Sequence, residues 1–217
     1  MLLAIDTSTR QIGVALFEGS RILTESAWTS PFHHTVELAP AVEQALRRTG
    51  ITFPDLSAIG VAIGPGSFTA LRIGLAFAKG LALARQTPLV GIPSLAVTAA
   101  GAPPSELPLV AVLEAGRKRL AAARCTWTGS GWQIAGAAEL VTLDVLAAGL
   151  TEPTILYGEL NPEAIAPLAG HPFARPMPAE RRPGLLAALA WKRFCDGEQD
   201  DPAALAPIYL STTGIDA

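Results

Sequence analysis

Charge is scarce in this sequence, and neither sign dominates. Charged residues make up 16% of the 217 residues, and 16 Lys and Arg against 19 Asp and Glu leave a net charge of −3. Because clustered Lys and Arg hold nucleic-acid phosphates, this balance argues against a chain that grips nucleic acid unaided. The basic clusters, Arg117 to Arg119 and Arg181 with Arg182, are short, and we expect both to be solvated surface.

Long hydrophobic runs are also lacking, although hydrophobic residues make up 50% of the chain. Arg72, Lys79 and Arg85 interrupt the longest apolar stretch, so no run reaches the roughly 18 residues that a membrane span needs. The apolar N-terminus ends at Asp6 and carries no basic leader. We therefore expect a cytoplasmic protein without a membrane segment.

Cysteine and histidine are too few and too scattered to suggest a metal site. Cys125 and Cys195 have no C-x-x-C spacing, so we expect buried free thiols and no disulfide framework. His33 and His34 are adjacent and do not point readily at one metal; we expect them at exposed or helix-entry positions, far from His171. Phosphate-loop, dinucleotide-binding, zinc-protease and serine-hydrolase motifs do not occur in the sequence.

The most informative feature that is present is a strand, turn and helix signature. It consists of an apolar run from Ala58 to Ile63, the turn Gly64-Pro65-Gly66-Ser67 and an apolar stretch from Phe68 to Arg85. Pro65 and Gly66 fit the central positions of a type II turn, with the positive φ at Gly66. Ser67 is placed to cap the first free N–H groups of the helix, and such a helix start attracts anions.

The helix expected at 68–85 is apolar almost all the way round. Small residues recur four apart along it, at Ala70, Gly74, Ala78 and Ala82. Their row would form a low ridge that lets another helix approach closely. A helix of this kind is either buried in its own fold or covered by a partner, and the sequence alone leaves both possibilities open.

The order of the expected elements predicts two lobes. In residues 1–102, strands are expected at 2–6, at 11–17, in a third run ending near 28, at 58–63 and at 89–92, with helices at 35–48 and 68–85. This order predicts a mixed sheet covered by helices. The stretch from Gly101 to Ser105 would link it to a smaller lobe at 103–217, whose C-terminal segment is free to return to the first lobe.

The smaller lobe is expected to contain a second meander. Its strands are expected at 109–113, 120–127, 132–137 and 154–157, and its helices at 142–148 and 185–195. Prolines recur between Asn161 and Pro183, so we expect an irregular loop there.

A polar turn, Asp6-Thr7-Ser8, follows the first apolar strand. Two-lobed kinases and actin-like ATPases use such a turn to place a carboxylate and hydroxyl groups beside the phosphates and magnesium of a nucleotide. An Asp at a strand end is also a common turn former, and this alternative stays open. The residues expected near a nucleotide are Asp6, Thr7, Ser8, Gly64, Gly66 and Ser67.

Three blocks of the sequence together resemble the TsaB (YeaZ) family. They are Ala4-Ile5-Asp6-Thr7-Ser8, then His34-Thr35 with Glu37-Leu38 and Pro40, and then Gly64 to Gly74 with Lys79-Gly80-Leu81-Ala82. The resemblance covers residues 1 to about 100 and continues more weakly beyond them. It implies an α/β chain with the two-lobed actin-like-ATPase (ribonuclease-H-like) fold.

The resemblance also implies a function in forming threonylcarbamoyladenosine next to the tRNA anticodon. The chain would be a noncatalytic scaffold that supports a TsaD-like catalytic subunit, joined by a TsaE-like ATPase, and would reach tRNA only through that complex. Alone it would form a homodimer. The resemblance also implies that ATP or ADP with magnesium could bind as a cofactor at the partner interface. The expected interface residues are Leu38, Val42, Leu46, Ala70, Gly74, Ala78 and Ala82.

Two other functions are alternatives to this one. A small ATP-dependent kinase or transferase of the same fold would need phosphate loops in both lobes, and the second lobe has no Asp-Gly-Thr-like turn. A peptidase would need a nucleophile or metal signature, which the sequence does not contain. The kinase or transferase therefore stays as the alternative to the scaffold.

Overall fold

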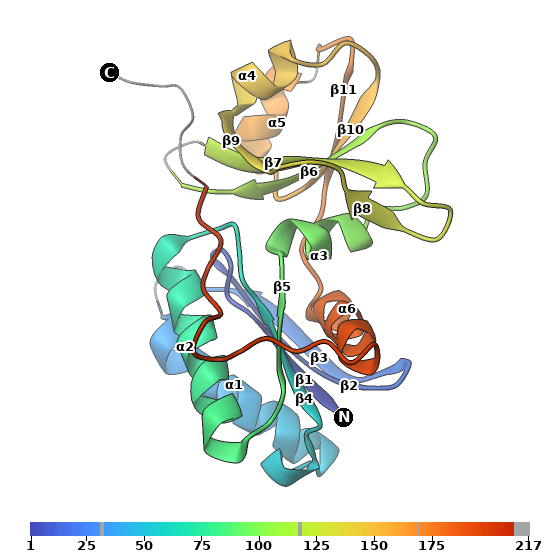
Figure 1. Cartoon of the computed structure of the whole chain (residues 1–217). Coiled ribbons are helices and arrows are strands. Elements are labelled where there is room, and N and C mark those ends of the chain that lie inside the picture. The colour runs from blue at the N-terminus through green and yellow to red at the C-terminus, as the bar shows by residue number, and fades with distance from the viewer. Residues whose placement is uncertain (31–32, 117–118, 169, 211–217) are drawn as a thin grey trace. The chain divides into compact units, whose positions relative to one another are not determined.

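The computed structural model describes residues 1–30, 33–116, 119–168 and 170–210, which form two compact units (Figure 1). Unit 1 consists of Met1–Ser94 and Arg182–Ile208, and unit 2 consists of Leu95–Arg181 and the segment that begins at Tyr209. This division falls earlier in the chain than the lobe boundary expected at residue 102, and a C-terminal segment belongs to unit 1. Each unit has its own sheet and its own apolar core.

Unit 1 is built on a mixed sheet with the strand order β3-β2-β1-β4-β5. Its strands are β1 (Leu2–Asp6), β2 (Gln11–Glu18), β3 (Arg21–Thr29), β4 (Ala58–Ala62) and β5 (Leu89–Ile92). The first three form an antiparallel meander, whereas β4 pairs parallel with β1, and β5 parallel with β4. The mixed sheet expected for the first lobe is confirmed.

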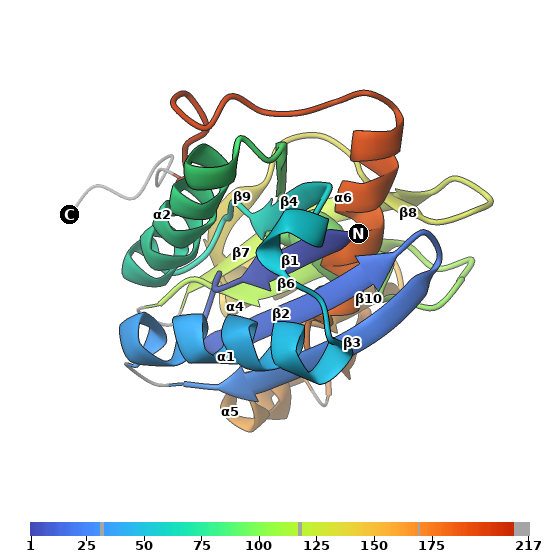
Figure 2. The same ribbon diagram turned by 90° about the horizontal axis from the view of Figure 1, so that it is seen from below.

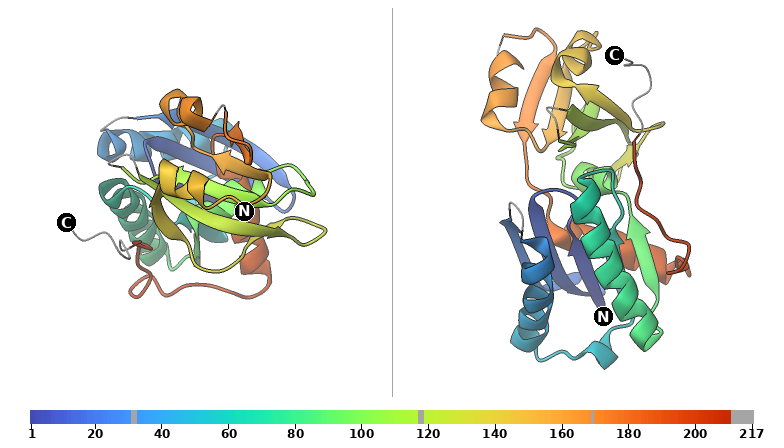
Figure 3. Two further views of the ribbon diagram at one scale, coloured as in Figure 1. Left: turned by 90° about the horizontal axis from the view of Figure 1, so that it is seen from above. Right: turned by 90° about the vertical axis from the view of Figure 1, so that its left-hand side faces the viewer.

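Helices cover both faces of this sheet. α1 (His34–Thr49) and α2 (Phe68–Arg85) pack on one face and α6 (Pro183–Cys195) on the other (Figures 1 and 3). Figure 2 shows α2 and α6 on opposite sides of β1 and β4. Alternate strand residues such as Leu3 and Val61 point into the core under α1 and α2. On the other face Gly60 admits α6, because a Cβ there would lie 2.6 Å from the Cβ of Ala190.

The two helices expected in the first lobe are confirmed. α2 has the expected bounds, and α1 extends one residue further at each end than the expected range 35–48. α1 ends where Gly50 adopts a left-handed φ of 70° and donates its N–H to the carbonyl of Arg47. A short 3-10 segment, η1 (Phe53–Asp55), follows before β4.

Unit 2 contains a second mixed sheet with the order β11-β10-β6-β7-β8, and β9 pairs with β7. Its strands are β6 (Leu109–Glu114), β7 (Arg119–Trp127), β8 (Trp132–Ile134), β9 (Glu139–Thr142), β10 (Thr154–Gly158) and β11 (Ala174–Pro178). Its helical segments are α3 (Ser94–Ala100), α4 (Leu143–Ala148), α5 (Pro162–Ile165) and the 3-10 segment η2 (Ala166–Leu168). Leu95 of α3 and Ala147 of α4 belong to separate apolar clusters of this unit.

Two features of this region differ from the sequence prediction. The sequence predicts an irregular loop over 161–183, but α5, η2 and β11 lie within it. β11 is an edge strand, where Pro176 and Pro178 need not donate an N–H to a further strand. In addition, α3 directly precedes the stretch expected as a linker at 101–105, and no helix was predicted there.

Two expectations about single side chains are also wrong. Cys125 is buried, but Cys195 is exposed at the end of α6. Arg181 is only 3% exposed, because its Nη1 lies 2.5 Å from Oε1 of Glu159 within unit 2. The other basic cluster includes residues 117 and 118, which lie outside the described residues. Among the helices that the structure describes, none combines the length and apolar composition of a membrane span.

Candidate functional site

The Asp6-Thr7-Ser8 turn lies at the C-terminal end of β1 and is almost completely buried. Asp6 is 3%, Thr7 1% and Ser8 0% exposed. The backbone N–H of Ser8 donates to Oδ1 of Asp6 at 2.8 Å, which closes a local Asx turn. Oγ1 of Thr7 donates to the carbonyl of Ala70 at 2.7 Å and so ties the strand end to the first turn of α2. Asp6 therefore does form a turn at the end of β1, which is the alternative that the sequence left open.

The Gly64–Ser67 turn packs directly against the Asp6-Thr7-Ser8 turn. The backbone N–H of Ser67 donates to the carbonyl oxygen of Ser8 at 2.7 Å. A Cβ on Gly66 would lie 2.0 Å from that same oxygen, so the close approach requires glycine. The type II geometry predicted from the sequence is wrong, because Gly64 holds the positive φ, at 99°, and Gly66 does not. The side chain of Ser67 also makes no capping hydrogen bond to α2.

Ser94, two residues after β5 and the first residue of α3, is a third member of this site that the sequence did not predict. Its hydroxyl lies 2.5 Å from the Ser8 hydroxyl and accepts a hydrogen bond from the Gly64 N–H at 3.1 Å. Its own N–H donates to the Gly64 carbonyl at 2.7 Å. The available signal was topological: the carboxyl ends of parallel strands meet at one edge of a sheet, and a polar residue follows the apolar run at 89–92.

The start of α1 is joined to the same edge. Nε2 of His34 lies 2.9 Å from the carbonyl oxygen of Thr9, and His34 is buried at the helix entry. Trp28 on β3 donates its indole N–H to Oε2 of Glu37 at 2.7 Å. This hydrogen bond holds the pKa of Glu37 below its usual range. These contacts give His34 and Glu37 structural partners within unit 1.

Chemically, the site consists of turns that bond to one another. The N–H groups of Ser8, Gly64 and Ser67 all donate to atoms of the chain itself. A phosphate group could reach them only by replacing those hydrogen bonds. Among the described residues, no group of three or more His, Cys, Asp and Glu side chains is placed to share a metal ion. The structure brings the six residues expected near a nucleotide together, and their role beside a nucleotide stays a prediction.

The seven residues expected at a partner interface lie under α1 and α2, against the sheet of unit 1. All of them are buried, with exposed fractions of 1% at Leu38 and 0% at Ala78, for example. The small-residue row packs so closely that a Cβ on Gly74 would lie 2.2 Å from Oγ1 of Thr7. The choice of helix face therefore needs correction, because these side chains are already covered by their own fold. Whether α1 and α2 meet a partner stays a prediction. The full set of corrected residues is Leu38, Val42, Leu46, Ala70, Gly74, Ala78 and Ala82.

The opposite faces of these helices expose large apolar side chains. Phe68 is 53% and Leu83 64% exposed on α2, and Val36 is 65% exposed on α1. The Arg72 guanidinium carbon lies 3.6 Å from the centre of the Phe68 ring. A groove of about 550 Å³ runs along this side, lined by Thr35, Phe68, Thr69, Arg72, Ile73, Ala76 and Phe77. Because α2 is apolar on all sides, its sequence did not distinguish this face from the buried one.

Comparisons with known proteins point consistently to one family. A family model described as "TsaD: tRNA N6-adenosine threonylcarbamoyltransferase" matches residues 29–166. The chain is 38% identical over 101 residues to the tRNA threonylcarbamoyladenosine biosynthesis protein TsaB of Escherichia coli, and 39% identical over 99 residues to that of Bacillus subtilis. Each match covers 46% of this chain and 43% of the relative, so it spans less than half the length of these curated relatives.

Two further comparisons extend over nearly the whole chain. An uncharacterized protein of Mycobacterium bovis is 34% identical over 214 residues, which cover 96% of this chain and 90% of that protein. The solved structure of YeaZ from Pseudomonas aeruginosa superposes with a TM-score of 0.79 at 25% identity, covering 96% of this chain and 99% of the other. These findings confirm the expected fold class, an α/β chain of the actin-like-ATPase (ribonuclease-H-like) type with mixed sheets covered by helices.

Proposed function

The chain belongs to the TsaB (YeaZ) group of the family that the TsaD model describes, and from this membership we propose that it takes part in forming threonylcarbamoyladenosine in tRNA. The observation that carries the proposal is the similarity to two TsaB proteins at 38% and 39% identity, within a chain that follows the YeaZ fold over 96% of its length. Both TsaB relatives are named for the biosynthesis of this modified nucleoside.

Within that process, the chain acts as a noncatalytic scaffold for a TsaD-like catalytic subunit. The hydrogen bonds of the candidate site support this role, because Ser8, Gly64 and Ser67 use their N–H groups to join the turns of unit 1. A site that performs phosphoryl transfer needs donors that are available to phosphate oxygens. A TsaE-like ATPase joins the same assembly, and tRNA is reached through the complex, in keeping with the net charge of −3. ATP or ADP with magnesium would bind at the interface with this partner.

The surface proposed for the catalytic subunit is the outer face of α1 and α2. Phe68 and the groove beside it expose apolar area there, and an exposed apolar patch marks a protein interaction site. In the absence of the catalytic subunit, a second copy of the chain covers the same face through a twofold contact. The homodimer and the complex with the catalytic subunit are therefore mutually exclusive.

Copurification with a TsaD-like subunit, combined with a nucleoside measurement, tests the proposal. In a bacterium depleted of its own TsaB, the chain should restore threonylcarbamoyladenosine in digested tRNA, as measured by mass spectrometry. Phe68→Arg should abolish both copurification and restoration, because it places a charge in the apolar contact. The matched control is Val145→Arg in unit 2, where a side chain that is 57% exposed lies on a different element.

The outcomes separate the parts of the proposal. If the wild-type chain restores the nucleoside and Phe68→Arg binds normally, the proposed face is wrong and the function stands. If the wild-type chain neither binds a TsaD-like subunit nor restores the nucleoside, the function itself is wrong.

A further inference from the structure

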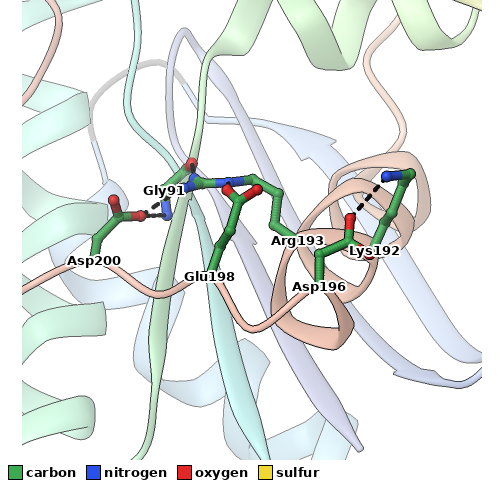
Figure 4. Close-up of polar contacts among 6 residues, drawn as sticks. All are labelled: Gly91, Lys192, Arg193, Asp196, Glu198 and Asp200. Carbon is green, nitrogen blue, oxygen red and sulfur yellow. Dashed lines mark hydrogen bonds and ion pairs between the residues drawn. The ribbon is translucent and has the colours of Figure 1, made fainter.

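β5 is an outer strand of the unit 1 sheet, and the chain's own C-terminal segment covers its free edge. The backbone N–H of Asp200 donates to the Leu89 carbonyl at 2.8 Å, and these two residues form an isolated antiparallel bridge. Oδ2 of Asp200 accepts the Gly91 N–H at 2.7 Å. Nη1 of Arg193 on α6 donates to the Gly91 carbonyl, also at 2.7 Å. Figure 4 shows both side chains converging on Gly91 from the two sides.

The two side chains also hold each other. Nη1 of Arg193 lies 3.3 Å from Oδ2 of Asp200, and its Nε donates to Oε2 of Glu198 at 2.7 Å. One Arg and one Asp therefore satisfy both backbone groups of Gly91 and neutralise each other's charge. The side chains of this pair are 33% and 27% exposed, which limits screening by solvent.

A neighbouring ion pair provides a natural comparison. Lys192 and Asp196 also pair, at 2.8 Å, and Figure 4 shows them beside the first group. Their side chains are 77% and 50% exposed, and the two residues are only four positions apart at the end of α6, so this ion pair does not itself join α6 to β5. An exposed pair of this kind contributes little to stability. Loss of Asp196 should therefore leave the sheet edge unchanged.

The same segment continues from the sheet edge to the candidate site. A Cβ on Gly91 would lie 3.0 Å from Cδ1 of Leu205, so Leu205 packs directly over the strand. Further along, the Ile208 N–H donates to the Ile63 carbonyl at 2.7 Å. The Ile208 carbonyl oxygen lies 2.8 Å from where a Cβ of Gly64 would be. The segment therefore contacts both the outer edge of β5 and the turn that contains Gly64.

We propose that residues 198–208 form a C-terminal clasp that substitutes for a further strand on β5 and holds the Gly64 turn in place. An uncovered strand edge presents backbone donors and acceptors to other chains and is a site of edge-to-edge association. The clasp closes this edge from within the same chain, with Asp200 as its central contact. This inference concerns unit 1 alone and does not depend on the proposed function.

Hydrogen exchange on the full-length chain tests the clasp. In Asp200→Ala, the amides of Leu89 to Ile92 and of Gly64 should exchange about tenfold faster, because the hydrogen bonds to a charged acceptor are lost. Asp196→Ala is the matched control and should exchange as the wild type does. Asp200→Asn, which keeps an acceptor oxygen for the Gly91 N–H, should show a smaller increase and serves as the second variant if the alanine variant does not fold.

Two exchange results would overturn the proposal. Unchanged exchange at these amides in both Asp200 variants would show that the segment does not hold the edge. An equal acceleration at β1, β2 and β5 would show a general loss of stability in place of local opening.

The protective role has its own measurement. Phe68→Arg is combined with Asp200→Ala, so that association through the outer face of α2 does not interfere. Light scattering should then show larger species for the double variant than for Phe68→Arg alone as protein concentration rises. An identical mass for the two proteins at every concentration would contradict the proposed protection of the edge.

Discussion

The hydroxyl groups of Ser8 and Ser94 lie 2.5 Å apart although 86 positions separate the two residues in the sequence. Both residues are 0% exposed, and each follows a strand that ends at the same edge of the unit 1 sheet. The contact joins the end of β1 to the end of β5. With Gly64 between them, these residues hold the candidate site together from three separate parts of the chain.

Replacing Ser94 should destabilise unit 1. Ser94→Ala removes the acceptor for the Gly64 N–H and the partner of the Ser8 hydroxyl, which leaves buried polar groups unsatisfied. The expected loss is about 1–3 kcal/mol of unfolding free energy. Urea titration followed by circular dichroism measures it. Ser20→Ala is the control, because Ser20 is exposed and should change stability very little. Equal midpoints for both variants would show that the hydroxyl network is dispensable.

Two glycine substitutions should have opposite effects. Gly66→Ala places a Cβ 2.0 Å from the Ser8 carbonyl oxygen and should cost about 1–3 kcal/mol or more, because backbone must move. Gly80→Ala lies on the open side of α2 with no atom within 4 Å of its Cβ, and should stabilise the helix by about 0.5–1 kcal/mol. Thermal melting of both variants checks the pair. A stable Gly66→Ala protein would contradict the close approach of the two turns.

Enlarging Ala78 should test which helix face is covered by the chain itself. Ala78 is 0% exposed, so Ala78→Trp should overpack the core and lower the unfolding free energy by about 1–3 kcal/mol or more. Leu83→Arg, at a side chain that is 64% exposed, should leave the melting temperature near that of the wild type. If Ala78→Trp melted normally and lost only partner binding, the small-residue row would be the partner surface after all.

The two cysteines should differ in reactivity. Burial raises the pKa of the Cys125 thiol and keeps reagent away, whereas Cys195 is exposed. A disulfide reagent such as Ellman's at mildly alkaline pH should therefore modify one thiol in the native protein and both in denaturant. In Cys195→Ser, the remaining thiol of Cys125 should react only as fast as the native fold opens to expose it. Rapid native labelling of that variant would mean that Cys125 is accessible.

The isolated chain should not hydrolyse ATP appreciably. The N–H groups of Ser8, Gly64 and Ser67 already donate to the chain itself, so a nucleotide phosphate finds no free set of donors among them. Phosphate release by the purified protein, with Asp6→Ala as the comparison, measures this. Turnover that disappears in Asp6→Ala would favour the alternative of a small kinase or transferase over the scaffold.

Local sequence patterns predicted most elements of unit 1 because its strands and helices bury regular apolar faces. β1, β5 and α2 have the expected bounds, and α1 differs by one residue at each end. The prediction failed where a conformation depends on distant residues. The positive φ belongs to Gly64, where the carbonyl of Ile208 leaves no room for a Cβ. The residues next to Gly64 in the sequence do not predict this contact with a distant part of the chain.

The same limit explains the second half of the chain. A run of prolines between 161 and 183 predicts a loop, yet β11 forms there because an edge strand tolerates proline. Arg181 is charged and predicts surface, yet Glu159 provides a buried partner for it. Composition alone does not reveal which strand will be an edge or which charge will find a partner.

The sequence by itself determined the order of the strands and α-helices in residues 1–92, the mixed sheet of unit 1 and the resemblance to one family, since these follow from local periodicity and from motif blocks. Tertiary structure alone decided which face of α2 is covered. That helix is apolar on all sides, so its own residues allow either face to be buried. The position of β1 decides which face is buried. Thr7 bonds to the carbonyl of Ala70 and leaves room for nothing larger than glycine at position 74. Phe68 and Leu83, on the other face, remain exposed.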